Sequence, residues 1–377
     1  MGIPNRYREL PPNPFRPGRR DLLVGFAGAV ISAMDAVAGA TRRVTLPSES
    51  DRTRVLRVVD RRTVAHDENV VALTLAADDD EPLPRWHPGA HIDVHLPSGL
   101  LRQYSLCGDP HISDAYRLAV RRIPDGGGGS IEVHDALRVG ATVTTHGPRN
   151  AFPLTIPGYG SPTQRFRFIA GGIGITPILP MLGLARRMGV DWSMVYAGRS
   201  RDSLPFVDEV TRFGAGRADN GAEDQVRIVT DDVDGLPSAP DLIGDCPPGT
   251  AVYACGPAPM LTAIRSELAG RDDVELHFER FAAAPVVDGK EFAVTVASTG
   301  QEVRVGADET LLAALNRSGV QAPYSCQQGF CGTCRTRVLD GSVEHRDTLL
   351  TIPEHENRMM LICTSRAAEG SHLTLDL

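Results

Sequence analysis

Long apolar runs, a surplus of positive charge and paired zinc knuckles are all missing from this sequence. No run of 18 or more apolar residues is free of charge, so a membrane-spanning helix is not expected. The formal net charge of −8 argues against a nucleic-acid partner. No internal repeat is visible, so the sequence gives no sign of a repeat array.

Cysteine is also scarce. The chain has 377 residues and seven cysteines, and Cys107, Cys246 and Cys255 lie outside the pattern of four described next. These three do not make a disulfide framework, and reduced thiols suit the cytoplasm, where we expect the protein to be. The length predicts two or three domains, and the 42% of apolar residues is ample for packed cores.

The other four cysteines form one pattern. Cys326, Cys331 and Cys334 have the spacing C-x4-C-x2-C, and Cys363 follows after a long gap. This is the plant-type spacing for a 2Fe–2S cluster, whose iron prefers soft thiolate ligands. Zinc is the main rival, but four-cysteine zinc sites usually use paired C-x2-C knuckles and this chain has one such knuckle. The spacing therefore predicts an iron–sulfur cluster.

Residues 1–52 form an N-terminal extension with two open interpretations. Arg19-Arg20 followed by an apolar stretch that ends at Ala38-Gly-Ala40 resembles an export signal. Asp35 interrupts that stretch, and a charge is costly inside a signal core. We therefore favour a helix that packs on the protein or on a partner.

The rest of the chain predicts a multidomain protein with β and α/β units. Residues 53–160 contain short strands with turns between them, which predicts a small antiparallel β-barrel. Residues 161–282 alternate strands and helices, which predicts a doubly wound parallel α/β domain that binds ligands at the carboxyl ends of its strands. Residues 290–377 contain a strand pair, a helix, the cysteine loop and a final strand, which fits a β-grasp fold.

Four short motifs precede the cysteines, and each is a weak signal alone. They are Arg102-Gln-Tyr104-Ser105, Gly129-Ser130, Gly171-Gly-Ile-Gly174-Ile-Thr176-Pro177 and Cys255-Gly256-Pro257. A glycine-rich turn can serve close packing as well as a pyrophosphate, and an Arg-Tyr-Ser strand can be a surface ladder. In this order, with the cysteine loop last, they resemble the phthalate dioxygenase reductase and vanillate demethylase reductase family over roughly residues 53–377.

The resemblance implies that the barrel binds FMN. It assigns the phosphate to Arg102, Gly129 and Ser130, because a guanidinium pairs well with a phosphate. It assigns the remaining flavin contacts to Gln103, Tyr104, Ser105, Ala119, Val120, Arg121, Thr176 and Phe281. Of these, Ser105 would bond near flavin N5 and Phe281 would cover the ring until nicotinamide displaces it. Arg121 could equally be a solvated strand residue.

The resemblance also implies that the α/β domain binds NADH. It places Gly172, Gly174 and Pro177 beside the pyrophosphate, and Cys255, Gly256 and Pro257 near the nicotinamide. The expected catalytic residues are Ser105, Thr176 and Cys255, although Cys255 could instead be a small buried residue that closes its strand.

The residues that would discriminate NADH from NADPH are ambiguous. Arg199 and Arg201 could bind a 2′-phosphate, whereas Asp202 would repel it. The family resemblance favours NADH.

The expected function is that of the reductase component of a multicomponent oxygenase. NADH would give a hydride to FMN, and the 2Fe–2S cluster would pass single electrons to a partner oxygenase, either a Rieske enzyme or a cytochrome P450. Two alternatives stay open. One is a stand-alone NAD(P)H flavin reductase for a small acceptor, and the other is a redox-sensing iron–sulfur protein.

Overall fold

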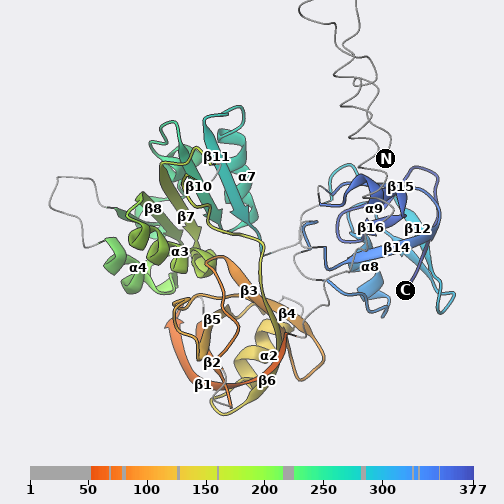
Figure 1. Ribbon diagram of the computed structural model, residues 1–377, viewed down its shortest axis with the longest axis horizontal. Coiled ribbons are helices and arrows are strands. Elements are labelled where there is room, and N and C mark those ends of the chain that lie inside the picture. Colours follow the sequence, from red (N-terminus) through yellow and green to blue (C-terminus); the bar gives the residue numbers. More distant parts are fainter. Residues whose placement is uncertain are drawn as a thin grey trace, which may run out of the picture. The chain divides into compact units, whose positions relative to one another are not determined.

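The computed structural model describes ten stretches of the chain (Figure 1). They are residues 52–67, 69–78, 82–124, 128–158, 161–214, 225–281, 286–324, 327–329, 332–347 and 349–377. The extension of residues 1–51 is a separate unit and lies outside the described residues, so the helix or export signal expected there stays a prediction. Residues 52–377 form the other unit, and its described part contains three large sheets.

The first sheet has six antiparallel strands in the order β4-β3-β6-β1-β2-β5 and curls into a barrel (Figure 1). Leu56, Leu73, Ile92 and Leu118 fill its core because alternate residues of a strand point to the same face. Helix α2 adds Val133 to that core. The elements are β1 (Thr53–Ala65), β2 (Val70–Ala77), β3 (Ala90–His95), β4 (Leu101–Ser105), β5 (Ala115–Arg121), α2 (Gly129–Ala136) and β6 (Thr142–Asn150).

The second sheet is parallel, with the strand order β11-β10-β7-β8-β9. Phe168 of β7 packs in a core shared with α3, and its neighbour Ile169 packs in another core shared with α6 and α7, so helices cover both faces. The strands are β7 (Arg165–Gly171), β8 (Asp191–Gly198), β9 (Val226–Thr230), β10 (Thr250–Cys255) and β11 (Val274–Glu279). The helices are η2 (Gly172–Gly174), α3 (Ile175–Met188), η3 (Arg201–Ser203), α4 (Val207–Gly214), α5 (Asp231–Asp234), α6 (Ala239–Ile243) and α7 (Ala258–Glu267).

The third sheet has the order β13-β12-β18-β14-β16, beside a two-stranded sheet of β15 and β17. Helix α8 packs Leu311 and Leu315 against it. Buried Arg366 donates hydrogen bonds of 2.7–2.8 Å to the carbonyls of Lys290, Gly306 and Glu309. The elements are β12 (Phe292–Val296), β13 (Glu302–Val305), α8 (Leu311–Arg317), β14 (Arg335–Asp340), β15 (Val343–Glu344), α9 (Ile352–Glu356), β16 (Met359–Leu361), β17 (Arg366–Ala367) and β18 (Leu373–Leu375).

The predicted fold class is confirmed. An antiparallel barrel, a parallel α/β sheet and a mixed sheet with one packed helix follow one another along the chain. The carboxyl ends of β7 and β10 lie side by side because the two strands pair in parallel register, with Cys255 opposite Ala170. The two motifs expected to bind the dinucleotide are thus adjacent.

Candidate functional site

A cavity lies beside β4 of the barrel and carries four of the residues expected to bind the flavin. Arg102, Gln103, Ser105 and Phe281 all line it. The amide of Gln103 is fixed by a 2.7 Å hydrogen bond to buried Asp93. The full lining is His91, Leu101, Arg102, Gln103, Ser105, Ala151, Glu279, Arg280, Phe281, Tyr324, Gln327 and Gln328.

Arg102 lies against the start of α2, where a phosphate is expected. A Cβ atom on Gly129 would come within 2.4 Å of the Arg102 Nε, so the arginine side chain lies directly against the first residue of the helix. A guanidinium and a helix N-terminus that meet in this way favour an anion. Ser130 is turned elsewhere, because its hydroxyl accepts a 3.0 Å hydrogen bond from the backbone N–H of Ile123. Its contact with the phosphate stays a prediction.

Four other residues expected at the flavin do not line this cavity. Tyr104 packs against the barrel core, and burial raises its pKa to about 12. Val120 belongs to the barrel core, and Ala119 to the core that includes α3. Thr176 is buried, and its hydroxyl donates to the carbonyl of Ile173 at 3.0 Å. Direct flavin contacts of these four residues stay predictions.

Glu279 is a residue of this cavity to which sequence reasoning gave no role. It ends β11 opposite Cys255, and its side chain is buried. Burial raises the pKa of Glu279 to about 8, although a hydrogen bond from Ser105 lowers it in part. The only signal in the sequence was its place two residues before Phe281.

The polar atoms around this cavity fit a polar cofactor. Glu279 Oε2 and Arg280 Nε are buried and lack a hydrogen-bond partner among the described residues. An unsatisfied buried polar atom is costly, and a bound flavin has donors and acceptors that can satisfy it. The arginine at the α2 end suits the phosphate of the same molecule.

Cys255 is held where the two glycine-rich turns meet. It is fully buried, and burial together with the neighbouring Glu279 raises its thiol pKa well above the usual range. A Cβ atom on Gly174 would lie 2.2 Å from the Cys255 carbonyl oxygen, and one on Gly256 would lie 3.1 Å from the Gly171 backbone. Gly174 and Gly256 therefore serve close packing, and their contacts with NADH stay predictions, as do those of Cys255.

A larger cavity of about 570 Å³ opens at the carboxyl ends of β7 and β8. Of the residues expected to bind NADH, Gly172 and Pro257 line it, whereas Pro177 is buried in α3. Arg121, expected at the flavin, lines this cavity with Val70, its strand partner in β2. The remaining lining residues include Gly171, Ile173, Gly198, Arg199, Ser203, Asp231, Leu236, Pro237, Pro259 and Met260.

The described part of the cluster site brings two of the four expected ligands together. Cys334 precedes β14 and Cys363 follows β16, and these strands pair with Arg335 opposite Leu361, so both buried cysteines lie at one end of the pair. Gly329 has a φ of +82°, a conformation that favours glycine. A side chain at this position would also clash with Thr364. Cys326 and Cys331 lie outside the described residues, so their role stays a prediction.

Comparison with known proteins identifies the family. Residues 294–368 match the model of the 2Fe-2S iron-sulfur cluster binding domain. The chain is 40% identical over 329 residues to vanillate O-demethylase oxidoreductase of Pseudomonas sp. (strain HR199 / DSM 7063), covering 84% of this chain and 97% of that protein. It is 38% identical over 315 residues to phenoxybenzoate dioxygenase subunit beta of Ectopseudomonas oleovorans, covering 82% and 93%. The chain belongs to the family of oxygenase reductases.

Solved structures agree with this assignment to the oxygenase reductases. Phthalate dioxygenase reductase, described as a modular structure for electron transfer from pyridine nucleotides to [2Fe-2S], is 30% identical with a TM-score of 0.59, covering 86% of this chain and 98% of that one. An intact type IV self-sufficient cytochrome P450 monooxygenase is 38% identical with a TM-score of 0.64. The match covers 86% of this chain but 41% of that longer one.

Membership of the oxygenase reductases confirms the main functional predictions. The protein is an oxidoreductase and the reductase component of a multicomponent oxygenase, with a partner oxygenase as electron acceptor. The expected cofactor set of FMN, NADH and a 2Fe–2S cluster is confirmed as well. No helix among the described residues is long and apolar enough to cross a membrane.

Proposed function

We propose that the cavity beside β4 holds the flavin, that the cavity at the ends of β7 and β8 holds NADH, and that the cluster loop receives electrons directly from the flavin site. The supporting observation is a shared wall, by which we mean that residues of the cluster loop also line the flavin cavity. Tyr324, Gln327 and Gln328 flank the first cluster cysteine in the sequence and line the flavin cavity. Gln328 also donates a hydrogen bond to the carbonyl of Arg280, next to Phe281.

Each side chain at this cavity has a separate task in the proposal. Arg102 and the start of α2 bind the FMN phosphate, and Asp93 holds Gln103 in place. Ser105 and Glu279 form a buried pair at the reacting end, and Glu279 keeps its proton at neutral pH because its pKa is about 8. Phe281 is 51% exposed, so it can move aside when nicotinamide arrives. Bound FMN supplies the conversion of a two-electron hydride into single electrons.

The acceptor in this proposal is a separate oxygenase, either a Rieske enzyme or a cytochrome P450. The similarity to the type IV self-sufficient P450 supports the second choice, and the similarity to vanillate O-demethylase oxidoreductase and phthalate dioxygenase reductase is compatible with the first. Cytochrome c and ferricyanide serve as test acceptors, because ferricyanide takes electrons from the flavin and cytochrome c takes them from the cluster.

The test is the Cys334→Ser variant, with Cys246→Ser as a matched control. Cys246 is buried in the core of the α/β sheet, away from the cluster segments. We expect Cys334→Ser to lose the cluster absorbance, keep the flavin and oxidise NADH normally with ferricyanide. Its cytochrome c reduction should fall by at least about 100-fold, because the flavin then has no route to large acceptors. Unchanged cytochrome c reduction would refute the shared-wall route, and a normal cluster spectrum would refute the ligand assignment.

Two further outcomes separate the oxygenase reductase from a stand-alone flavin reductase. Addition of a purified oxygenase of either type should couple NADH oxidation to product formation only with an intact cluster. Equal rates for Cys334→Ser and wild type with every acceptor would favour the flavin reductase.

We also propose a cytoplasmic location. Cys107, Cys246 and Cys255 are buried and form no disulfide, which suits a reducing compartment. Recovery of the protein in a periplasmic extract would contradict this.

A further inference from the structure

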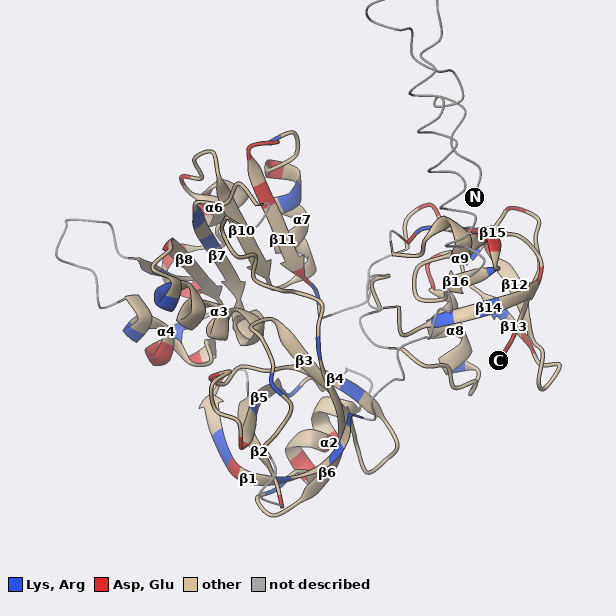
Figure 2. Cartoon of the chain, viewed as in Figure 1, with Lys and Arg blue, Asp and Glu red and all other residues tan. Residues whose placement is uncertain are grey.

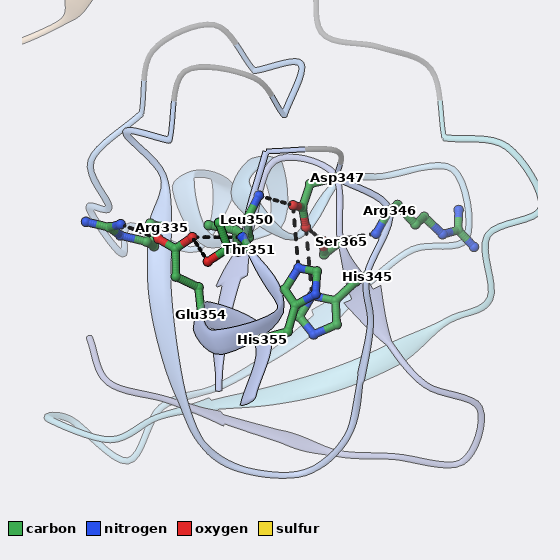
Figure 3. A network of polar contacts seen from close by, with 9 residues as sticks. All are labelled: Arg335, His345, Arg346, Asp347, Leu350, Thr351, Glu354, His355 and Ser365. Atoms are coloured by element: carbon green, nitrogen blue, oxygen red, sulfur yellow. Dashed lines mark hydrogen bonds and ion pairs between the residues drawn. The ribbon is translucent and has the colours of Figure 1, made fainter. Parts of the chain in front are cut away.

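His345, Asp347 and His355 gather in the third sheet's unit, outside the flavin and nucleotide cavities (Figure 3). His345 and Asp347 lie in the segment after β15, and His355 lies in α9. One ligand atom from each of the three side chains lies within 4.8 Å of the others. Neither flavin chemistry nor the four expected cluster cysteines uses these residues.

Asp347 is the centre of this group. Its side chain is fully buried, with 0% exposed. Its Oδ2 accepts from the backbone N–H of Leu350 at 2.9 Å, and its Oδ1 accepts from the hydroxyl of Ser365 at 3.2 Å. These neutral donors hold the carboxylate but do not neutralise it. Within the described ranges its only ion-pair partners are the two imidazoles, and a buried carboxylate without a cation is costly.

The imidazole nitrogens approach Asp347 without a hydrogen bond. His345 Nδ1 lies 3.8 Å from Oδ1, and His355 Nε2 lies 3.6 Å from Oδ2. Both nitrogens are buried and lack a hydrogen-bond partner in the described part of the chain. Ligand atoms bound to one tetrahedral zinc ion at about 2.0–2.1 Å lie roughly 3.3 Å apart. Each gap ends on a different carboxylate oxygen, and a closure of a few tenths of an ångström would bring each to that distance. The three ligand atoms, which lie within 4.8 Å of one another, must also close around one point.

The ring geometry sets one condition for metal binding. The two imidazoles are stacked with centroids 3.7 Å apart and planes at 21°, so their lone pairs lie in two nearly parallel planes that do not meet near the rings. One ring must turn before both nitrogens can reach the same ion. His345 and His355 are 24% and 28% exposed, which leaves a side open for this rotation and for entry of an ion.

The backbone that carries His355 is held in place. Thr351 and Glu354 form a capping box at the start of α9, with hydrogen bonds of 2.8 Å from the Thr351 N–H and hydroxyl to Glu354. Arg335 at the start of β14 pairs with Glu354 at 2.8 Å. Figure 2 shows the basic residues of this unit in blue. The helix is thereby fixed to the strand that follows Cys334, so a ring rotation at His355 need not move the backbone.

We propose that His345, Asp347 and His355 bind a divalent first-row metal ion, for which Zn²⁺ is the reference. Two imidazoles and one carboxylate with an open position form a ligand set that zinc accepts. Ser365 and the Leu350 N–H supply the outer hydrogen bonds that orient such a carboxylate. The ion compensates the buried charge of Asp347 and joins α9 to the segment after β15.

The test uses the full-length holoprotein with its flavin and cluster. Zn²⁺ is titrated by calorimetry after chelator treatment, and bound zinc and iron are measured per chain. We expect one zinc per chain with unchanged iron content and cluster absorbance. His345→Gln, His355→Gln and Asp347→Asn should each weaken zinc binding at least tenfold. His372→Gln is the matched control, because His372 is exposed in the same unit and bonds to Thr295 instead.

Three results would overturn the proposal. The first would be a wild type that binds no stoichiometric zinc. The second would be zinc binding by both histidine variants as tight as that of the wild type, and the third would be zinc uptake matched by loss of iron. A histidine variant that loses the cluster absorbance is misfolded, and the other histidine variant then decides. Absence of zinc binding in the wild type refutes the site whatever the variants do, and leaves the two imidazoles as a stacked pair around Asp347.

Discussion

Replacement of Glu279 by glutamine should stabilise the protein at neutral pH. Burial raises the pKa of Glu279 to about 8, whereas the unfolded chain has a glutamate pKa of about 4.3. Between these two values the unfolded chain releases a proton that the folded protein retains. The wild type therefore loses stability as the pH rises from about 4.3 to about 8. Glutamine resembles the protonated carboxyl in shape but cannot ionise.

The size of the effect follows from the two pKa values. One pKa unit corresponds to about 1.4 kcal/mol, so the full difference approaches about 5 kcal/mol above pH 8. At pH 7 the wild type has lost about 3–4 kcal/mol of this stability, and at pH 5 about 1 kcal/mol. With roughly 2–4 °C per kcal/mol for a unit of this size, the variant should melt roughly 7–14 °C higher at pH 7.

The assay is thermal release of the flavin, followed by its fluorescence from pH 4 to pH 9. The two proteins should melt together near pH 4 and diverge as the pH rises. Glu275→Gln is a control, because Glu275 lies on the same strand but its side chain is 31% exposed and hydrogen-bonded to His277. A constant difference across the pH range would refute the reasoning, because it would show that Glu279 keeps the same charge in the folded and unfolded chain.

Two further substitutions test the nucleotide site. Gly174→Ala should destabilise the protein by about 1–3 kcal/mol, measured as a lower Tm, because the new Cβ would lie 2.2 Å from the Cys255 carbonyl oxygen. Gly183→Ala is the control and should not lower the Tm, because its Cβ would meet only side-chain atoms at 3.6 Å or more. Arg199→Ala should lower kcat/KM for NADPH by about tenfold more than for NADH, since Arg199 lines the nucleotide cavity. Arg201→Ala should change kcat/KM for NADPH and for NADH by the same factor, because Arg201 lies 3.8 Å from Asp208 instead. If Arg199→Ala also changed the two values by the same factor, Arg199 would not be the residue that discriminates the cofactors.

The sequence was sufficient to predict the fold class and the family, because both predictions rest on the spacing and order of short motifs. Four cysteines at plant-type spacing and a glycine-rich turn after a buried strand constrain the backbone strongly. Strand pairing also explains which cavity Arg121 lines, but only once the structure is known. Its partner Val70 lines the nucleotide cavity, so Arg121 lies there too and not in the cavity beside β4.

The protonation of Glu279 and the grouping around Asp347 could not be predicted in the same way. A glutamate at a strand end is usually exposed, and its burial here depends on the neighbouring strand that carries Cys255. His345 and His355 are ten positions apart, in a loop and a short helix. No period of helix or strand connects such positions, so only the tertiary fold brings them together.

The order of the units along the chain differs from the order in which electrons pass. Electrons go from NADH to flavin to cluster, whereas the sequence runs from barrel to α/β sheet to ferredoxin unit. If the barrel holds the flavin, as proposed, it must contact both of the others. It does so through Arg117 of β5, which pairs with Glu209 of α4 at 2.9 Å, and through Leu101 of β4, whose carbonyl accepts a hydrogen bond from Tyr324, 223 positions away. The proposed flavin cavity thus belongs to a unit that contacts both the donor and the acceptor units.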